Sequence, residues 1–185
     1  MAKTHDVKAK KCKVCRAKFI PRSSFQLTCS IPCAFQLVRK ASEKKWKKDA
    51  KLAKERLMTK TDYLKRCQAV FNKFINLRDR GKPCIACNKP MNKAIHASHY
   101  RTTKAASQLR FNEDNCHSGC YACNVGLSGN ILEYRINLIK RIGPERVEAL
   151  ENNNEVIRWS VDEIKGIERE YKEKIKALKR TGGDS

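Results

Sequence analysis

Cys84-Ile-Ala-Cys87 and Cys120-Tyr-Ala-Cys123 are two short cysteine pairs that enclose a long insert in the middle of the chain. Four thiolates in this spacing suit one tetrahedral Zn²⁺, with each sulfur at about 2.3 Å from the ion. A zinc ion with four thiolate ligands has no open position, so the pattern predicts a structural site and not a catalytic one. Cys116 leaves an alternative open, because it could replace one ligand by pairing with Cys120.

The insert carries polar side chains suited to chemistry. His96 and His99 lie near its start, Asn115 lies near its end, and Asn124 directly follows the second cysteine pair. A zinc-bound β-hairpin followed by a helix would place His99 at the end of a strand, Asn115 in a loop and Asn124 at the start of the helix. We therefore expect these three side chains to face one cleft. For His96, a role in the site and a structural role both stay open.

A second group of cysteines lies near the N-terminus and has a different spacing. Cys12 and Cys15 are separated by two residues, and Cys29 and Cys33 by three. This spacing predicts a second zinc ion held by four thiolates, in an N-terminal zinc ribbon. We expect a structural staple, and direct reading of DNA bases is the alternative.

The composition restricts the functional classes. The chain has 185 residues, ten cysteines, 41 Lys and Arg and 19 Asp and Glu, which gives a formal net charge of +22. Its start lacks the apolar segment of a signal peptide, and no stretch is apolar enough to span a membrane. Closely paired cysteines without a secretion signal indicate zinc sites in a reducing, cytoplasmic compartment. The positive charge favours nucleic acid as the partner, with an anionic membrane surface as the rival.

Residues 34–58 predict a long basic helix, because they are rich in Lys, Ala, Glu and Leu and contain neither Gly nor Pro. Trp46, Ala50, Ala53 and Leu57 recur at helical spacing and form a narrow apolar stripe. Such a stripe suits pairing with a second helix or lying over DNA, and an exposed helix without a partner is the alternative. Four lysines of this segment are candidates for contacts with backbone phosphates: Lys44, Lys45, Lys47 and Lys48.

Further helices are expected from Thr61 to about residue 80, at 131–142, and after a capping box formed by Ser160 and Glu163. Cys67 falls on the apolar face of the first of these and is expected to be a buried thiol. The sequence therefore predicts a mainly helical α+β protein. Four regions are expected: a basic arm and zinc ribbon at 1–33, a basic helical region at 34–82, a small zinc-bound ββα core at 83–142 and a C-terminal helical region at 143–185.

The order CxxC, His, Asn, CxxC-Asn resembles the HNH (ββα-metal) endonuclease motif, in its variant with Asn as the third letter. The wider stretch resembles the NinG (Rap) recombination proteins of lambda-like phages. It runs from His96-Ala-Ser-His99-Tyr-Arg through Asn115-Cys-His-Ser-Gly-Cys-Tyr-Ala-Cys-Asn124 and Ser128-Gly-Asn130 to Tyr134-Arg135. The N-terminal cysteines and the helix near Trp159-Ser160 are also similar to that family, so the resemblance covers nearly the whole chain. It implies an HNH-like nuclease core at 83–142 that cuts branched DNA, such as Holliday junctions, in phage recombination.

The resemblance also implies a mechanism with one divalent metal ion, Mg²⁺ or Mn²⁺. His99 would act as general base, Asn124 would bind the metal through its carbonyl oxygen, and Asn115 would hold the loop that orients His99. Ser98 stands where the motif usually has a metal-binding Asp or His, and His96 is the candidate for the missing ligand. Further candidates for DNA contacts are Arg101, Lys104 and Arg110.

Cutting a Holliday junction requires two matched nicks, so the resemblance implies a two-fold homodimer. The expected partners are branched DNA and other phage recombination proteins, in the cytoplasm of the bacterial host. The apolar stripe from Trp46 to Leu57 is the candidate pairing surface. Two alternatives stay open: a zinc-dependent nucleic-acid-binding protein without chemistry, and an adaptor that recruits a recombinase.

Overall fold

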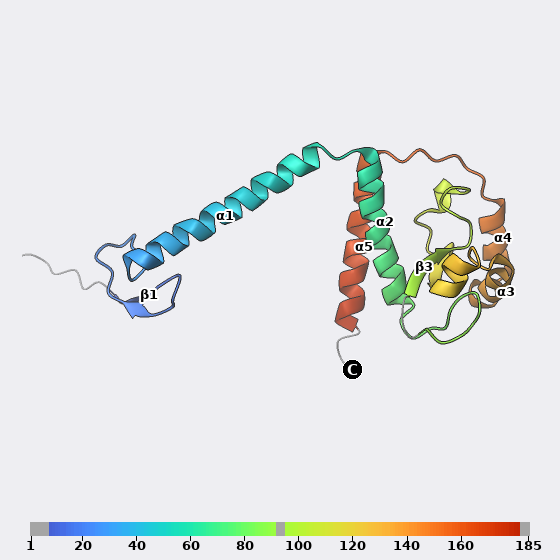
Figure 1. Ribbon diagram of the computed structural model, residues 1–185, viewed down its shortest axis with the longest axis horizontal. Coiled ribbons are helices and arrows are strands. Elements are labelled where there is room, and N and C mark those ends of the chain that lie inside the picture. The colour runs from blue at the N-terminus through green and yellow to red at the C-terminus, as the bar shows by residue number, and fades with distance from the viewer. Residues whose placement is uncertain (1–7, 92–94, 182–185) are drawn as a thin grey trace, which may run out of the picture. The chain divides into compact units, whose positions relative to one another are not determined.

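The computed structural model describes residues 8–91 and 95–181, and the chain divides into two compact units, Met1–Met58 and Thr59–Ser185 (Figure 1). Residues 1–7 of the predicted basic arm lie outside the described residues. The boundary between the units falls inside the predicted region 34–82. The reason is local: a new helix is capped at Thr59, so the two helices of that region belong to different units.

The first unit starts with a minimal hairpin beside the cysteines. Strands β1 (Lys10–Lys11) and β2 (Lys18–Phe19) are antiparallel. Helix α1 (Ile31–Arg56) follows, and the Ser30 side chain caps it by accepting a hydrogen bond from the backbone N–H of Cys33. The structure therefore contains a small hairpin and a long basic helix in this region. Cys33 of the N-terminal cysteine group lies in the first turn of that helix.

Helix α1 buries none of its side chains within the described structure. Trp46 is 70% exposed and Leu57, just past the end of the helix, is 83% exposed, so the predicted apolar stripe is uncovered there. Helices in globular proteins gain most of their stability from packing an apolar face. The stripe is thus available for a contact, and its use in pairing two copies stays a prediction.

In the second unit, helices α2 (Lys60–Arg78) and α5 (Val161–Thr181) lie side by side (Figure 1). Tyr171 of α5 packs edge-on against Phe71 of α2, with ring centroids 4.9 Å apart. Cys67 is fully buried on the apolar face of α2, which confirms the predicted buried thiol. The two helices are far apart in sequence and form one side of the unit.

Both of these helices start with side-chain caps. Thr59, and not the predicted Thr61, caps α2 in a reciprocal capping box with Asp62. Ser160 and Glu163 form the predicted box at the start of α5: the N–H of Ser160 donates to Glu163 Oε2 at 2.7 Å, and the N–H of Glu163 donates to Ser160 Oγ at 3.2 Å. The capping motifs in the sequence therefore fix where the helices begin.

A two-stranded antiparallel sheet packs against α2 and leads into the remaining helices. Strands β3 (Ile95–His99) and β4 (Cys116–Cys120) pair in a register that places His99 opposite Cys116. The loop between them contains a short 3₁₀ turn, η1 (Ser107–Leu109). After β4 come a π-helical turn and two helices: η2 (Ala122–Gly126), α3 (Ile131–Ile142) and α4 (Pro144–Asn152).

The core of the second unit includes two cysteines of the central group. Cys84 and Cys123 are buried in the same cluster as Tyr134 and Leu138 of α3 and Val147 of α4. The mainly helical α+β class with two small sheets is confirmed. None of the helices within 8–91 and 95–181 has a segment both apolar and extended enough for a transmembrane span.

Candidate metal centres and catalytic recess

The central cysteines converge on one point. The sulfurs of Cys84, Cys87, Cys120 and Cys123 all lie within 4.8 Å of one another, and Cys87 Sγ is 3.9 Å from Cys120 Sγ. Four sulfurs at about 2.3 Å around a tetrahedral zinc ion are about 3.8 Å apart, so this cluster can hold zinc. Cys116 is not part of the cluster, so the symmetric CxxC/CxxC assignment is the one the structure supports.

The backbone prepares the central cluster for a cation. Burial opposes ionisation of Cys84, but N–H groups of Cys120, Cys87 and Ala86 outweigh it and lower the pKa of the Cys84 thiol to about 7. The N–H of Cys120 donates to Cys84 Sγ at 3.3 Å. Since zinc binds thiolates and not thiols, these donors prepare Cys84 for a metal ion, whereas burial raises the pKa of the Cys87 and Cys123 thiols.

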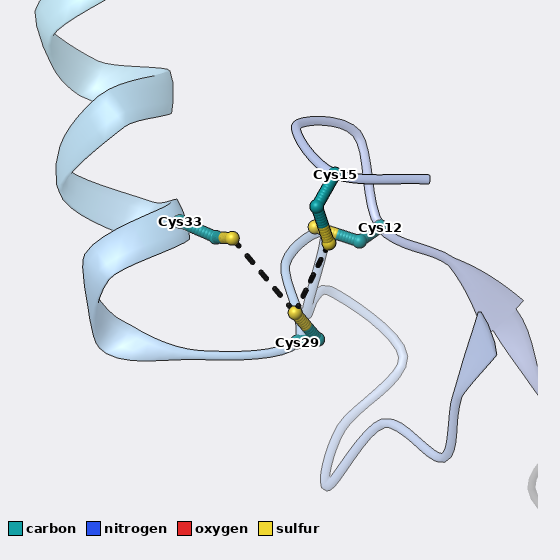
Figure 2. A group of neighbouring side chains, drawn as sticks. All are labelled: Cys12, Cys15, Cys29 and Cys33. Carbon is teal, nitrogen blue, oxygen red and sulfur yellow. Dashed lines mark hydrogen bonds between the residues drawn. The ribbon is translucent and has the colours of Figure 1, made fainter. Parts of the chain in front are cut away.

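The N-terminal cysteines form a second cluster of the same kind. Figure 2 shows the sulfurs of Cys12, Cys15, Cys29 and Cys33 pointing toward one another, and all lie within 4.8 Å. Cys33 reaches the cluster from the first turn of α1. Backbone N–H groups, that of Cys15 first, lower the pKa of the Cys12 thiol to about 6. Both predicted four-cysteine groups are therefore present as clusters that could each hold one zinc ion.

A recess of about 210 Å³ lies beside the β3–β4 hairpin and contains two of the predicted catalytic residues, His99 and Asn124. Asn115 does not line it and is fully buried. His96 does not line it either: residues three apart on a strand face opposite sides, and the His96 ring lies 5.6 Å from that of Tyr121. The expectation that three side chains face one cleft is thus met by two. The other lining residues are Ala97, Thr102, Thr103, Ser128, Gly129 and Ile131.

His99 is held in one orientation. Its Nε2 lies 3.0 Å from the carbonyl oxygen of Arg110, and because a carbonyl only accepts, Nε2 carries the proton and Nδ1 is the basic nitrogen. Nδ1 lies 3.7 Å from Cys116 Sγ, and the ring packs against Phe71. Burial lowers the pKa of the imidazole below its usual 6.5, so His99 is neutral at pH 7. A neutral imidazole with a fixed tautomer can accept a proton.

Asn115 fastens the loop that orients His99. Its Oδ1 accepts the N–H of Arg101 at 2.8 Å, and its Nδ2 donates to the carbonyl oxygens of Arg101 at 2.9 Å and Leu109 at 3.1 Å. Leu109 immediately precedes Arg110, whose carbonyl holds the imidazole of His99. Asn115 therefore links the two ends of this loop, next to the residue that contacts His99.

One protein family matches nearly the whole length of this chain. A family model described as the bacteriophage lambda NinG protein matches residues 4–181. The chain belongs to the NinG family. It is 37% identical to protein ninG of Escherichia phage 933W over 95% of this chain and 96% of the relative, and 37% identical to that of phage lambda over 92% and 93%. Protein ninG of Salmonella phage P22 is 36% identical over 89% and 90%. No solved structure matches the chain.

The residues of this NinG-family chain that were predicted to contact DNA lie in different surroundings. The Arg101 guanidinium donates to the carbonyl oxygens of Leu150, Glu151 and Asn153, so it ties the insert to the C-terminal end of α4. Arg110 Nη1 lies 3.3 Å from Gln68 Oε1. Lys104 is exposed, as are four lysines on α1: Lys44, Lys45, Lys47 and Lys48. The DNA contacts assigned to these residues stay predictions, and Arg101 has its own structural role.

Sequence reasoning missed the hydroxyl groups of the recess and the thiol beside the imidazole. Thr102, Thr103 and Ser128 line the recess with Asn124. Cys116 lies next to His99 because the two are cross-strand partners. Only the register of the hairpin could have revealed this neighbour, since 17 residues separate the pair in the chain.

The recess is a weak site for a divalent cation by itself. Its oxygen donors are neutral amide and hydroxyl groups, and no carboxylate is among its described lining residues. Mg²⁺ in proteins is usually bound by one or two carboxylates together with substrate phosphates. The recess of this NinG-family chain therefore offers a divalent ion only neutral oxygen ligands.

Buried His117 on β4 predicts a loss of stability in acid. Its Nδ1 has no hydrogen-bond partner among the described residues, and burial followed by the charge of Arg78 lowers its pKa to about 3. Between about pH 6.5 and this value, His117 binds a proton in the unfolded chain but not in the folded one. The contribution of His117 to stability is therefore constant above pH 6.5 and falls below it. At pH 5.5 the free energy of unfolding should drop by about 1.4 kcal/mol.

Urea unfolding of the wild type and of His117→Gln at pH 7.5 and 5.5 measures this contribution. Zinc release in acid affects both proteins alike, so the difference between their pH dependences isolates His117. Equal pH dependences in the two proteins would contradict the prediction.

Proposed function

We propose that this NinG-family protein is a metal-dependent DNA endonuclease of the HNH type that hydrolyses phosphodiesters at branched DNA, such as Holliday junctions, in phage recombination. One observation carries the proposal: a neutral imidazole of fixed tautomer, His99, shares a recess with Asn124. The hairpin β3–β4 followed by η2 and α3 has the ββα order of that class, and a four-cysteine cluster joins them.

In this proposal His99 Nδ1 takes a proton from the attacking water. The nitrogen lies beside the Cys116 thiol, and burial raises the pKa of that thiol far above its usual range, so the thiol is neutral. A thiol is a weak hydrogen-bond donor, so a water molecule can replace it at Nδ1 at little cost. A positioned general base contributes about 10²- to 10⁴-fold to a rate.

The divalent ion would be held by the carbonyl oxygen of Asn124, the hydroxyl of Ser128 and the substrate phosphate. When bound, Mg²⁺ or Mn²⁺ would stabilise negative charge on the phosphoryl oxygen and on the leaving 3′ oxygen. His96 lies outside the recess and has no part in this ligand set. The zinc ions would be structural, because four thiolates leave zinc no position for substrate.

The charge of the chain supports DNA as the substrate. The net charge of +22 suits binding to a polyanion, and the four exposed lysines of α1 would contact phosphates without reading sequence. Two matched nicks require two copies, and the uncovered stripe from Trp46 to Leu57 is our candidate for their pairing surface. The protein would act with other phage recombination proteins in the host cytoplasm.

The test is a cleavage assay on a four-way junction and on a linear duplex of the same sequence. Purified protein is incubated with each DNA in Mg²⁺, in Mn²⁺ and in EDTA. We expect paired nicks near the branch with either ion, much weaker cutting of the duplex, and no cutting in EDTA. Cutting that persists in EDTA would exclude the metal-dependent mechanism.

A zinc-dependent DNA-binding or recombinase-recruiting protein without chemistry is the alternative, and the lack of a carboxylate among the described residues of the recess favours it. A truncation at the unit boundary separates these roles. If the protein is an adaptor, deleting residues 1–58 should abolish only the recruitment of the recombinase. If it is a nuclease that binds DNA through its first unit, the deletion should lower its affinity for DNA.

A further inference from the structure

A groove of about 440 Å³ runs between α2 and α5, away from the recess described above. Its walls carry many more cations than anions. Glu168 and Glu173 are its only described carboxylates. The cations are Arg66, Lys73, Lys165, Arg169, Lys172 and Lys176. None of these residues lines the recess that contains His99, so the groove is a separate surface of the same unit.

The cations of α5 form a regular row. Lys165, Arg169, Lys172 and Lys176 follow one another at steps of four, three and four, which places them on one face of the helix. A second hollow between the same two segments is lined by Arg80 and Lys179 and extends the row. From Lys165 to Lys179 the helix rises about 21 Å, roughly the length of six base pairs of duplex DNA.

Buried Glu168 organises the centre of the groove. The residue is 2% exposed, and its carboxylate accepts from Arg66 Nε at 2.8 Å and from Lys172 Nζ. Its charge is therefore already neutralised by two cations whose positions it fixes. Lys73 and Arg169 are exposed and have no carboxylate partner within the described residues, so they present uncompensated charge to solvent.

We infer that this groove binds the phosphate backbone of a DNA arm. Protein–DNA interfaces are much more positively charged than protein–protein interfaces, in which Lys is depleted, so a row of lysines and arginines favours DNA over an acidic protein. The inference deepens the proposed function and rests on it for the branched substrate. A surface on α2 and α5 and a recess beside β3 would contact two arms of one junction.

The test compares two variants with the same change in charge. The groove variant is Lys73→Glu with Arg169→Glu, and the control is Lys140→Glu with Arg158→Glu, at exposed positions outside the groove and the recess. The affinity of full-length protein for a fluorescent four-way junction is measured over a salt series without added Mg²⁺ or Mn²⁺. Thermal unfolding of each variant shows that it is folded.

We expect the groove variant to bind roughly tenfold or more weakly near 0.1 M salt. The slope of log Kd against log salt should fall by about 1.8, since each lost phosphate contact removes about 0.9. The control should keep most of the wild-type slope, and the charge-conserving variant Lys73→Arg with Arg169→Lys should keep all of it.

A folded groove variant with the wild-type slope would overturn the inference and would point to an acidic protein as the partner of the groove. Binding is read here without cleavage, so the two proposals fail separately. If the salt slopes are as expected but the wild type never nicks DNA, only the proposed nuclease activity is contradicted. If the wild type nicks junctions and the groove variant binds DNA normally, only the proposed role of the groove is contradicted.

Discussion

We expect the wild type to bind two zinc ions per chain, and the variant Cys84→Ser to bind one and to lose cooperative unfolding of the second unit. Cys84 is fully buried in the core with Tyr134 and Leu138, so the metal and the apolar core form one structure. Structural zinc contributes about 10 kcal/mol in small zinc domains, which is comparable to the whole stability of a typical domain. Metal analysis of the purified protein and thermal unfolding by circular dichroism measure the two effects.

Cys67→Ser is the matched control, because Cys67 is equally buried and lies outside both cysteine clusters. It should keep two zinc ions and unfold cooperatively, at a cost of about 1–3 kcal/mol for a buried hydroxyl. A Cys84→Ser protein with two zinc ions and an unchanged unfolding midpoint would show that the central cluster is not a zinc site.

The second large effect is expected for His99→Ala, which should lower the rate of junction cleavage by about 10²- to 10⁴-fold. The affinity for the junction should stay within about twofold, because the imidazole carries no charge at neutral pH and contributes little to holding the backbone. Single-turnover cleavage with enzyme in excess gives the rate, and binding without added divalent ion gives the affinity.

His96→Ala is the internal control for this experiment, since it removes the other imidazole of β3 from a position outside the recess. It should cut at a rate close to that of the wild type. Equal losses in the two variants would show that the strand, and not the His99 side chain, matters for activity. Unchanged cleavage by His99→Ala would remove the general base from the proposal.

The parts of the structure that the sequence predicted are those whose determinants are local. Both cysteine clusters follow from ligand spacing, and the start of α5 follows from a cap of four residues, Ser160 to Glu163. The side of β3 on which His96 lies could also have been predicted, because 96 and 99 differ by an odd number on a strand. That rule would have placed His96 on the opposite side of the strand from His99.

The parts that escaped prediction depend on pairing between distant segments. The contact of His99 with Cys116 requires the hairpin register, because 17 residues separate the pair in the chain. The groove between α2 and α5 joins segments that are far apart in the chain, such as those of Arg66 and Glu168. The row of cations on α5 can be found from its spacing, but the groove also needs Arg66 and Lys73 of α2, which only the packing of the two helices brings beside that row.

The turn that closes the recess next to α3 has an unusual backbone. Ser128, Gly129 and Asn130 all have positive φ, at 48°, 95° and 47°, and the N–H of Gly129 donates to the carbonyl oxygen of Cys123 at 2.8 Å. A Cβ atom at Gly129 would lie 3.3 Å from the Ile131 side chain. Few residue types accept this conformation. We therefore expect only a few residue types at these three positions. The sequence of this turn should vary less among phage relatives than the sequences of the surface loops around it.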